Sequence, residues 1–544
     1  MCGFSTYIGS DLSKESFIDK SKSIGYRGPD SQSFFESEKV MMAFYRLEII
    51  GSGEAGNQPI RDKEGGTVLI CNGEIYNYKE LISKFSLSPS TTSDCEVISL
   101  LYNKIGLEAT LDSLDGVYAF VLYDTGKDVV YAARDPYGVR PAFIGYEKSG
   151  GILIASEAKA IPDSCERITP FEPGTWWSSE DKNTFNPFIK KAYNIDFSLK
   201  EEDILKEIRR RLVSSVEKRM MSEREVGCLL SGGLDSSLIA ALVCRLSKGF
   251  RLIDDEWILK ENPISYPIKT FSIGMEGSPD LFFAEKVAKF IGSEHYNVML
   301  GEEEFIGAIP EVVYNIESYD TTTVRASVGN YLVSKFIRDN SDCKVVFNGD
   351  GSDEVCCGYV YNINAPSDID LHAEGERLVR ELYLFDVLRS DRSISSNGLE
   401  PRTPFLDKYF VEYYMSIDPS LKRFNKEDKM EKFLLRKAFE KDNLLPEDVL
   451  WRHKCAFSDG VSSAKSSWHT TLKRHVDTLI SDEEFDEKKN EIEHCKPLLK
   501  ESYYYRKLYN ESYEHCQNLI PHFWMPKWTD VIDPSARELS SYKE

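Results

Sequence analysis

The sequence has no run of apolar residues that approaches the roughly 20 needed to cross a membrane. Its first residues also lack the basic segment and apolar stretch of a secretory signal. Positive charge is scarce, because 67 Lys and Arg residues face 89 Asp and Glu residues and leave a net charge of -22. No basic face for a nucleic acid or an anionic membrane is therefore expected. These absences predict a cytoplasmic protein that binds neither.

Motifs for metals and disulfides are missing as well. The chain contains neither CxxC nor HExxH, so it predicts no zinc site. Its 12 cysteines have no regular spacing, which is typical of reduced thiols and not of a disulfide framework. At 544 residues the chain exceeds what one hydrophobic core accommodates, so at least two domains are expected.

The periodicity of the chain divides it in two. Short β-type runs at 67–77, 116–124, 128–135 and 151–157 surround one helical pattern at 94–106, which predicts an α+β domain of stacked antiparallel sheets. Residues 176–199 lose this period and are interpreted as a linker. Buried-type strands then follow at 225–230, 268–275 and 343–349, far enough apart for helical crossovers, which predicts a parallel α/β sheet with a helical C-terminal part. The predicted domains span 1–190 and 200–544.

The chain begins MCGF, and Cys2 is the first candidate for chemistry. A small residue at position 2 permits removal of Met1, which is also the bland explanation of the pattern. If Met1 is removed, Cys2 carries a thiol and a free α-amine on the same carbon. That amine has a pKa of about 7.7–8.0, so it can serve as general base for its own side chain.

Two glycine-containing stretches indicate an anion site. SGGLDSS (231–237) follows a strand and opens a helix, where exposed N–H groups and the helix dipole favour a phosphate. Asp235 is placed to hold a metal ion near it; the alternative is a simple helix cap after the turn. NGDGSDEV (348–355) follows another strand, at the edge where open α/β sheets bind ligands. A calcium loop is its alternative, although the EF-hand spacing is absent.

These motifs stand beside many others in a fixed order. The N-terminal ones are MCGF, YRGPDS (26–31), RLEIIG (46–51), NQP (57–59), NGEIYN (72–77), SDCEV (93–97), LDGVYAF (114–120) and ARDPYGVRP (133–141). The later ones are SGGLDSS, GSPDL (277–281), YDTTTVRAS (319–327), GSDEV (351–355), EPRTPFLD (400–407), KMEKFLLRKAF (429–439) and WRHKCAFSDG (451–460). Together they resemble the glutamine-hydrolysing asparagine synthetases of the AsnB type over nearly the whole chain.

The resemblance implies an N-terminal-nucleophile (Ntn) hydrolase sandwich, the class II glutamine amidotransferase domain, followed by a PP-loop ATP pyrophosphatase domain. It implies the substrates glutamine, aspartate and ATP with Mg²⁺, hydrolysis of glutamine to ammonia, and amination of β-aspartyl-AMP. Relatives are often homodimers, so a homodimer is an expectation.

The resemblance also implies site residues. In the glutaminase part, Cys2 would be the nucleophile, with the Asn72 side chain and the Gly73 N–H as oxyanion donors. The implied glutamine-binding residues are Arg46, Leu47, Glu48, Ile49, Ile50, Asn72, Gly73, Glu74 and Asp94. On residue type alone, Asn72-Gly73 could equally be a hairpin turn, and Asp94 could be a helix cap.

For the second part the resemblance implies three groups and a metal pair. The ATP-binding group is Leu230, Ser231, Gly232, Gly233, Asp235, Ser236, Ile273, Asn348 and Gly349. The aspartate-binding group is Thr322, Thr323 and Arg325, which could instead be an ordinary helix start. Asp350 and Lys454 would be catalytic, Lys454 by neutralising phosphate charge, although a lysine is usually a solvated residue. Asp235 and Asp353 would hold Mg²⁺.

One motif departs from the family pattern. The family usually reads SGEGSDE where this chain reads NGDGSDE, so Asn348 replaces a serine and Asp350 replaces a glutamate. A displacement near 1 Å can lower a rate about 100-fold, which predicts a working but slow synthetase unless the backbone compensates. CCG at 356–358 is also unusual and has no explanation from the sequence.

The alternative functions are those of a β-lactam synthetase relative, which would lack the working nucleophile, and of a catalytically silent protein.

Overall fold

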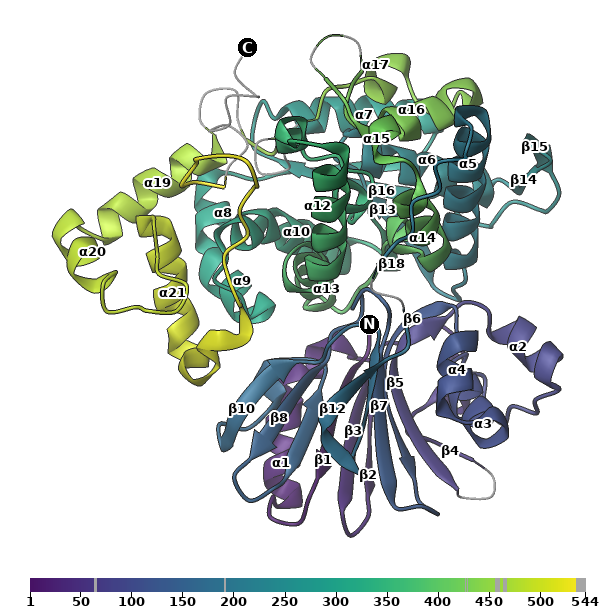
Figure 1. The fold of residues 1–544 in the computed structure, drawn as a ribbon, viewed down its shortest axis with the longest axis vertical. Coiled ribbons are helices and arrows are strands. Elements are labelled where there is room, and N and C mark those ends of the chain that lie inside the picture. Colours follow the sequence, from purple (N-terminus) through teal and green to yellow (C-terminus); the bar gives the residue numbers. More distant parts are fainter. Residues whose placement is uncertain are drawn as a thin grey trace.

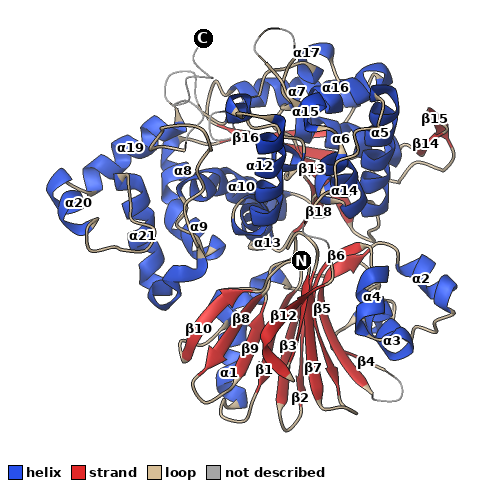
Figure 2. Ribbon diagram, viewed as in Figure 1, coloured by secondary structure: helices blue, strands red, loops and turns tan. Residues whose placement is uncertain are grey.

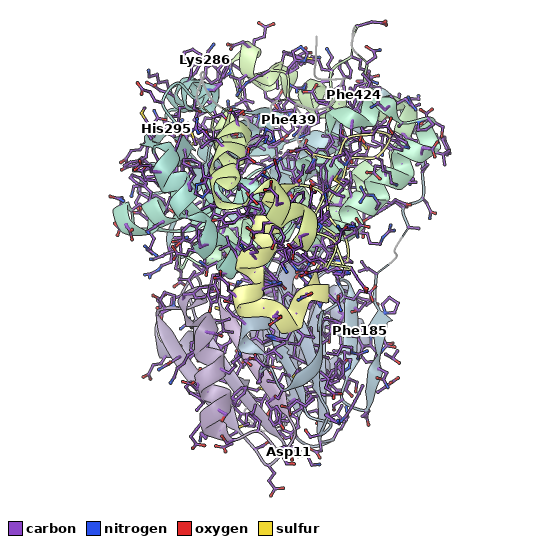
Figure 3. The ribbon with its side chains drawn as sticks, turned by 90° about the vertical axis from the view of Figure 1, so that its left-hand side faces the viewer. Asp11, Phe185, Lys286, His295, Phe424 and Phe439 are labelled. Atoms are coloured by element: carbon purple, nitrogen blue, oxygen red, sulfur yellow. The ribbon has the colours of Figure 1, made fainter. Side chains whose placement is uncertain are left out.

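The computed structural model describes residues 1–534 except 63–65, 190–191, 426, 428, 455–459 and 463–466. Figure 1 shows two parts, a β-rich N-terminal part below and a larger α/β part above. The side view in Figure 3 places Asp11 at the foot of the first part and Lys286 at the far end of the second.

The N-terminal part is a sandwich of two six-stranded antiparallel sheets, as predicted (Figure 2). The first sheet has the order β10-β8-β9-β1-β3-β2, and the second has the order β12-β11-β7-β6-β5-β4. The strands are β1 (Gly3–Ile8), β2 (Ser31–Glu36), β3 (Val40–Arg46), β4 (Ile60–Arg61), β5 (Thr67–Ile75), β6 (Gly116–Asp124), β7 (Val129–Arg134), β8 (Phe143–Glu147), β9 (Ile152–Ala155), β10 (Cys165–Pro170), β11 (Thr175–Ser178) and β12 (Asp181–Pro187).

Alternation along the strands explains why two layers form. Side chains such as Phe44 of β3 and Ile70 of β5 meet between the sheets, whereas Leu69 and Phe120 point outward and are covered by helices. The helices over this face are α2 (Tyr78–Phe85), α3 (Glu96–Ile105) and α4 (Leu107–Ser113), whereas α1 (Lys14–Ser21) packs against β1 and β3 of the first sheet. The helix predicted at 94–106 is therefore confirmed as α3.

The linker predicted at 176–199 is wrong in its first half. Those residues form most of β11 and all of β12, an edge hairpin of the second sheet. Trp177 of β11 is fully buried between the sheets, but β12 is mostly exposed and shows no apolar alternation. A strand with little burial has little hydrophobic period to read, which is why the pattern looked irregular.

The second part contains a five-stranded parallel sheet of order β17-β16-β13-β18-β19, as the crossover spacing predicted. Its strands are β13 (Glu225–Leu229), β16 (Lys269–Gly274), β17 (Glu294–Met299), β18 (Cys343–Phe347) and β19 (Glu400–Arg402), and a separate hairpin comprises β14 (Phe250–Ile253) and β15 (Glu256–Leu259). The helices are α5 (Glu201–Arg219), α6 (Leu234–Ser247), α7 (Pro279–Ile291), α8 (Glu302–Gly307), α9 (Ile309–Ile316), α10 (Thr321–Asn340), α11 (Ser352–Val355), α12 (Asp368–Glu381), α13 (Asp386–Ser395), α14 (Lys408–Ser416), α15 (Pro419–Lys422), α16 (Phe433–Phe439), α17 (Glu447–Leu450), α19 (Trp468–Leu479), α20 (Asp482–Lys488) and α21 (Lys500–Tyr513).

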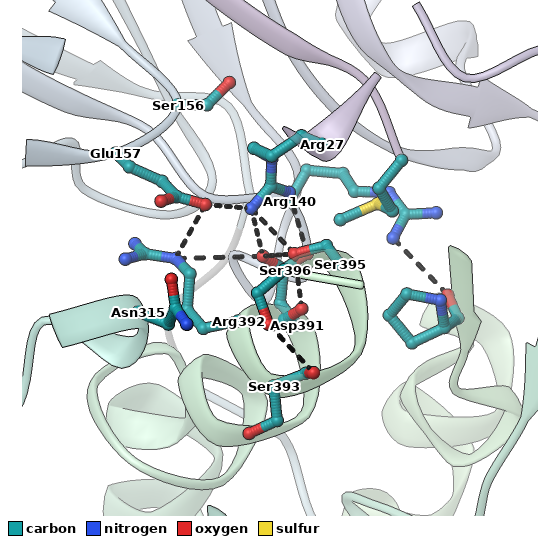
Figure 4. A network of polar contacts seen from close by, with 12 residues as sticks. Arg27, Arg140, Ser156, Glu157, Asn315, Asp391, Arg392, Ser393, Ser395 and Ser396 are labelled. Carbon is teal, nitrogen blue, oxygen red and sulfur yellow. Dashed lines mark hydrogen bonds and ion pairs between the residues drawn. The ribbon is translucent and has the colours of Figure 1, made fainter. Parts of the chain in front are cut away.

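A buried ionic network joins the two parts (Figure 4). Arg27 of the sandwich pairs with Glu157 and donates to Asp391 of α13 at 2.9 Å, and to Ser395 at 2.9 Å. Arg392 of α13 pairs in turn with Glu317 at 2.5 Å. Because every one of these charges is buried, the pairs fix how the sandwich is seated on the second part.

Two candidate active sites

The first candidate site is a cavity in the sandwich at the start of β1. The Cys2 thiol lies there and donates to the Leu47 carbonyl at 3.7 Å. All the glutamine-site residues implied by the resemblance line this cavity except Glu48, which instead pairs with Arg46 at 3.3 Å. The full lining is Cys2, Arg46, Leu47, Ile49, Ile50, Gly56, Gln58, Cys71, Asn72, Gly73, Glu74, Ser93, Asp94, Cys95 and Glu400.

Asn72 and Gly73 lie in the middle of β5, not in a hairpin turn, which removes that alternative. The Asn72 side chain is buried, and neither its amide nitrogen nor its amide oxygen has a hydrogen-bond partner among the described residues. A Cβ at Gly73 would lie 2.3 Å from the Val117 carbonyl oxygen, so the close approach of β6 requires glycine. The cavity therefore contains a buried amide donor that no group in the described part of the chain uses.

Opposite charges occupy two walls of this cavity. The Arg46 guanidinium donates to the carbonyls of Gly53 at 2.7 Å and Ile50 at 3.2 Å and pairs with Glu48 at 3.3 Å, so its positive charge is only partly compensated. Asp94 does not cap α3; its carboxylate accepts from the Ile75 N–H at 2.6 Å. Burial raises the pKa of Asp94 to about 6, so the carboxylate is mainly ionised at neutral pH.

While Met1 is attached, the Cys2 thiol is not activated as a nucleophile. Burial raises the pKa of the Cys2 thiol to about 11 and lowers that of the Met1 α-amine to about 6. The thiol is then protonated at neutral pH and is a poor nucleophile. Removal of Met1 would place an amine on the Cys2 carbon itself.

Glu400 is a member of this site that the sequence analysis missed. Its carboxylate lies 3.9 Å from the Met1 amine and 3.7 Å from Arg140, although Glu400 belongs to β19 of the second part. Two residues further along β19, the Arg402 carbonyl accepts from the Asn348 N–H at 3.0 Å. A single three-residue strand thus contacts both candidate sites. The only sequence signal was its place in the motif EPRTPFLD.

The second candidate site is a cavity at the carboxyl ends of β13, β16 and β18. SGGLDSS forms the turn from β13 into α6, with Gly232 at a φ of 73° and packed against Phe283, where a Cβ would lie 2.5 Å from the Phe283 side chain. A Cβ at Gly349 would lie 2.8 Å from the backbone of Asp235, so the two glycine-containing loops approach closely. Of the implied ATP-binding residues, all line this cavity except Gly232, whose carbonyl accepts from Arg452 at 3.0 Å.

Four charges face one another in this cavity. Lys432 Nζ lies 2.6 Å from a carboxylate oxygen of Asp235 and 2.6 Å from one of Asp353, and Lys454 pairs with the other Asp353 oxygen. Burial alone would raise the pKa of Asp353, but the two ammonium groups outweigh it and hold this pKa well below its usual range. The expected pair of acids is therefore present, together with a lysine that the sequence analysis did not single out.

Asp235 and Asp353 converge on one ammonium group, so their carboxylates are placed where a cation could be held, and Mg²⁺ at this position stays a prediction. Carboxylate oxygens are hard donors, and Mg²⁺ in nucleotide sites is commonly held by one or two carboxylates plus phosphates. No cluster of three or more His, Cys, Asp or Glu side chains suited to a metal occurs in the part of the chain that the structure describes. A metal here would need ligands from the nucleotide.

The two departures from the family pattern have partners on α13. Asn348 donates from Nδ2 to Ser390 Oγ at 2.7 Å. Asp350 pairs with Arg389 at 3.0 Å, and Arg389 also pairs with Asp386 at 3.1 Å. The shorter Asp350 side chain is thus already paired with a guanidinium group.

The three residues implied to bind aspartate do not line the cavity. Asp320 caps the start of α10, where its carboxylate accepts from the Thr323 N–H at 2.9 Å and from the Thr323 hydroxyl at 2.8 Å. The Arg325 guanidinium pairs with Glu501 at 2.7 Å and Asp533 at 2.8 Å. The third residue of the group, Thr322, has a buried hydroxyl with no hydrogen-bond partner among the described residues. Their role in aspartate binding stays a prediction.

The chain combines a two-sheet sandwich, which has a thiol at position 2, with a parallel sheet that has a glycine-rich loop. This combination is typical of an amidotransferase domain followed by a nucleotide-binding domain. The family described as glutamine amidotransferase domain matches residues 1–174, and the family described as asparagine synthase matches 207–368 and 364–531.

Curated relatives match over the full length. Asparagine synthetase [glutamine-hydrolyzing] of Gallus gallus is 42% identical, and that of Homo sapiens is also 42% identical; each alignment covers 100% of this chain and 99% of the relative. That of Mus musculus is 41% identical at the same coverage. The chain belongs to the family of glutamine-hydrolysing asparagine synthetases.

Among solved structures, glutamine PRPP amidotransferase from B. subtilis covers 56% of this chain and 91% of its own, with 15% identity and a TM-score of 0.32. Within the described residues, no helix combines the length and apolar character needed to cross a membrane.

Proposed function

We propose that this protein makes asparagine from aspartate, with glutamine as nitrogen donor and Mg-ATP as activator. The observation that carries the proposal is the joint presence, in one cavity, of the Cys2 thiol, the unpartnered Asn72 amide, the Arg46 guanidinium and the Asp94 carboxylate. A nucleophile, an oxyanion donor and two opposite charges are what hydrolysis of an amino-acid amide requires. A β-lactam synthetase relative or a silent protein would have no use for this set.

At the first site, Cys2 freed of Met1 would attack the amide carbonyl of glutamine and form a thioester, with release of ammonia. The Cys2 α-amine would take the thiol proton and pass it to the leaving nitrogen. The oxyanion that forms would be bound by the Asn72 amide and the Gly73 N–H. Water would then release glutamate. Arg46 would hold the substrate α-carboxylate and Asp94 its ammonium group.

At the second site, the N–H groups of the loop 231–237 at the start of α6 would bind the phosphates of ATP. The Lys454 ammonium would neutralise charge on the α-phosphate as the aspartate carboxylate displaces pyrophosphate. Mg²⁺, when bound, supplies further neutralisation of the phosphates, and Asp235 and Asp353 would hold it. Ammonia from the first site would displace AMP from β-aspartyl-AMP and yield asparagine.

A cytoplasmic location and a homodimeric state belong to the same proposal. The absence of a membrane-spanning helix from the described residues and the membership of the family support it. Gel filtration with light scattering would decide the oligomeric state.

The deciding experiment uses the Cys2→Ala variant in two assays. With glutamine as nitrogen donor, asparagine formation should be lost, because no thioester can form. With ammonium chloride, aspartate and Mg-ATP, asparagine should still be formed. If the wild-type protein released glutamate but never asparagine, the synthetase assignment would be wrong. Equal loss of both activities in the variant would refute the division of labour between the cavities.

A further inference from the structure

Lys432 has an unusual backbone and an unusual environment. It directly precedes α16 and has φ 56° and ψ 31°, a left-handed backbone conformation that residues with a Cβ seldom adopt. Its side chain is buried, and its ammonium group bridges Asp235 and Asp353 at 2.6 Å each. Strained residues of this kind persist where the surroundings enforce them and where function uses the position.

The unexplained segment CCG (356–358) makes room for this lysine. A Cβ at Gly358 would lie 2.0 Å from Lys432 Cε and 2.4 Å from Asp353 Oδ1. Only glycine fits there without moving Lys432 or the carboxylate. Gly358 also donates its N–H to the Asp353 carbonyl at 2.8 Å. The space for the lysine is therefore built by the fold and is not a chance rotamer.

Each oxygen of the two carboxylates faces a polar or charged group of the protein. Asp235 Oδ1 accepts from Ser352 Oγ at 2.8 Å, and its Oδ2 faces Lys432. Asp353 offers one oxygen to Lys432 and the other to Lys454. The charges of these two acids and two ammonium groups cancel one another, so a divalent cation arriving alone must displace an ammonium group to reach the carboxylates.

We propose that Lys432 is a built-in countercation that holds Asp235 and Asp353 together in the empty enzyme and must leave them when Mg²⁺ enters with ATP. Lys432 is thus a positioning residue that prevents metal from binding before the nucleotide. The phosphates bring the negative charge that accepts the displaced ammonium group. This inference rests on the proposed Mg-ATP function of the cavity.

The test measures binding of Mn²⁺ alone to the nucleotide-free full chain, by electron paramagnetic resonance of free Mn²⁺. Lys432→Met frees one oxygen on each carboxylate and should tighten Mn²⁺ binding at least tenfold. Lys437→Met, on α16 but half-exposed and paired with Glu440, is the matched control and should bind as wild type does. Adding a non-hydrolysable ATP analogue should tighten Mn²⁺ binding in wild type much more than in Lys432→Met.

Lys432→Gln provides a second route to the same end, because its neutral amide removes the ammonium charge from both carboxylates while keeping a polar side chain in the same space. It should also tighten Mn²⁺ binding, and it decides the matter alone if Lys432→Met fails to fold. Unchanged Mn²⁺ affinity in the folded variants would overturn the proposal. Failure of the wild type to form asparagine would instead refute the proposed function, whatever the Mn²⁺ result.

Discussion

The Asn72→Ala substitution separates catalytic from structural roles, because activity and stability should move in different directions. A buried amide without partners costs about 1–3 kcal/mol of stability, and Asn72 is 1% exposed with both amide atoms unpartnered among the described residues. Removing the amide relieves that cost and roughly offsets the packing lost. We therefore expect the thermal unfolding midpoint to stay level or to rise.

The same substitution removes one oxyanion donor. Loss of such a donor typically lowers kcat by about 100- to 1000-fold, or about 2.7–4 kcal/mol of transition-state stabilisation. Glutamate release from glutamine by the Asn72→Ala variant should fall by that factor. Synthesis from ammonium chloride should persist, since Asn72 does not line the second cavity.

Asn77→Ala is the matched control. Asn77 follows Asn72 by five residues, but its amide is satisfied: Nδ2 donates to the Ser113 carbonyl at 2.9 Å and Oδ1 accepts from the Asp115 N–H at 3.0 Å. Losing two hydrogen bonds should lower stability by about 1–3 kcal/mol and leave glutamine hydrolysis nearly intact. The reasoning is refuted if Asn72→Ala hydrolyses glutamine within tenfold of wild type, or if it destabilises the protein more than Asn77→Ala does.

Three further predictions concern other parts of the molecule. Because burial raises the pKa of Asp94 to about 6, protonation below that pH removes the charge that binds the substrate ammonium group. The KM for glutamine should therefore rise about tenfold per pH unit below pH 6 and be constant above pH 7. Equal KM values at pH 5 and pH 7.5 would contradict this prediction. Asp350→Glu adds a methylene to the buried pair with Arg389, so it should lower stability by about 1–3 kcal/mol and slow aspartate-dependent pyrophosphate–ATP exchange by up to about 100-fold. Faster exchange would show that the shorter residue is a handicap. Arg27→Met removes one partner of the buried Asp391 carboxylate, so calorimetry should show that the free energy of unfolding falls by about 3–5 kcal/mol. A fall below about 1 kcal/mol would mean that the network does not fix the two parts relative to each other.

Local patterns in the sequence predicted much of the fold. Short runs rich in Val, Tyr and Phe at 116–124 and 128–135, bounded by turn formers, predicted the antiparallel strands β6 and β7, and the spacing of the runs at 225–230, 268–275 and 343–349 predicted parallel strands. Strands β17 and β19 and the β11–β12 hairpin were missed. They are short or half-exposed, so their membership in a sheet depends on neighbours distant in the sequence and not on their own period.

The features of the candidate sites also divide into those that the sequence predicted and those that it did not. The sequence by itself located the candidate nucleophile Cys2 and the glycine turn at 231–237, because a thiol at position 2 and a turn between strand and helix are properties of adjacent residues. Only the tertiary structure decided that the Asn72 amide lacks a partner within the described ranges, that Glu400 reaches the glutaminase cavity from β19, and that Lys432 bridges two acids. Each depends on which distant group packs closest, and hydrogen bonds and ion pairs follow from that packing.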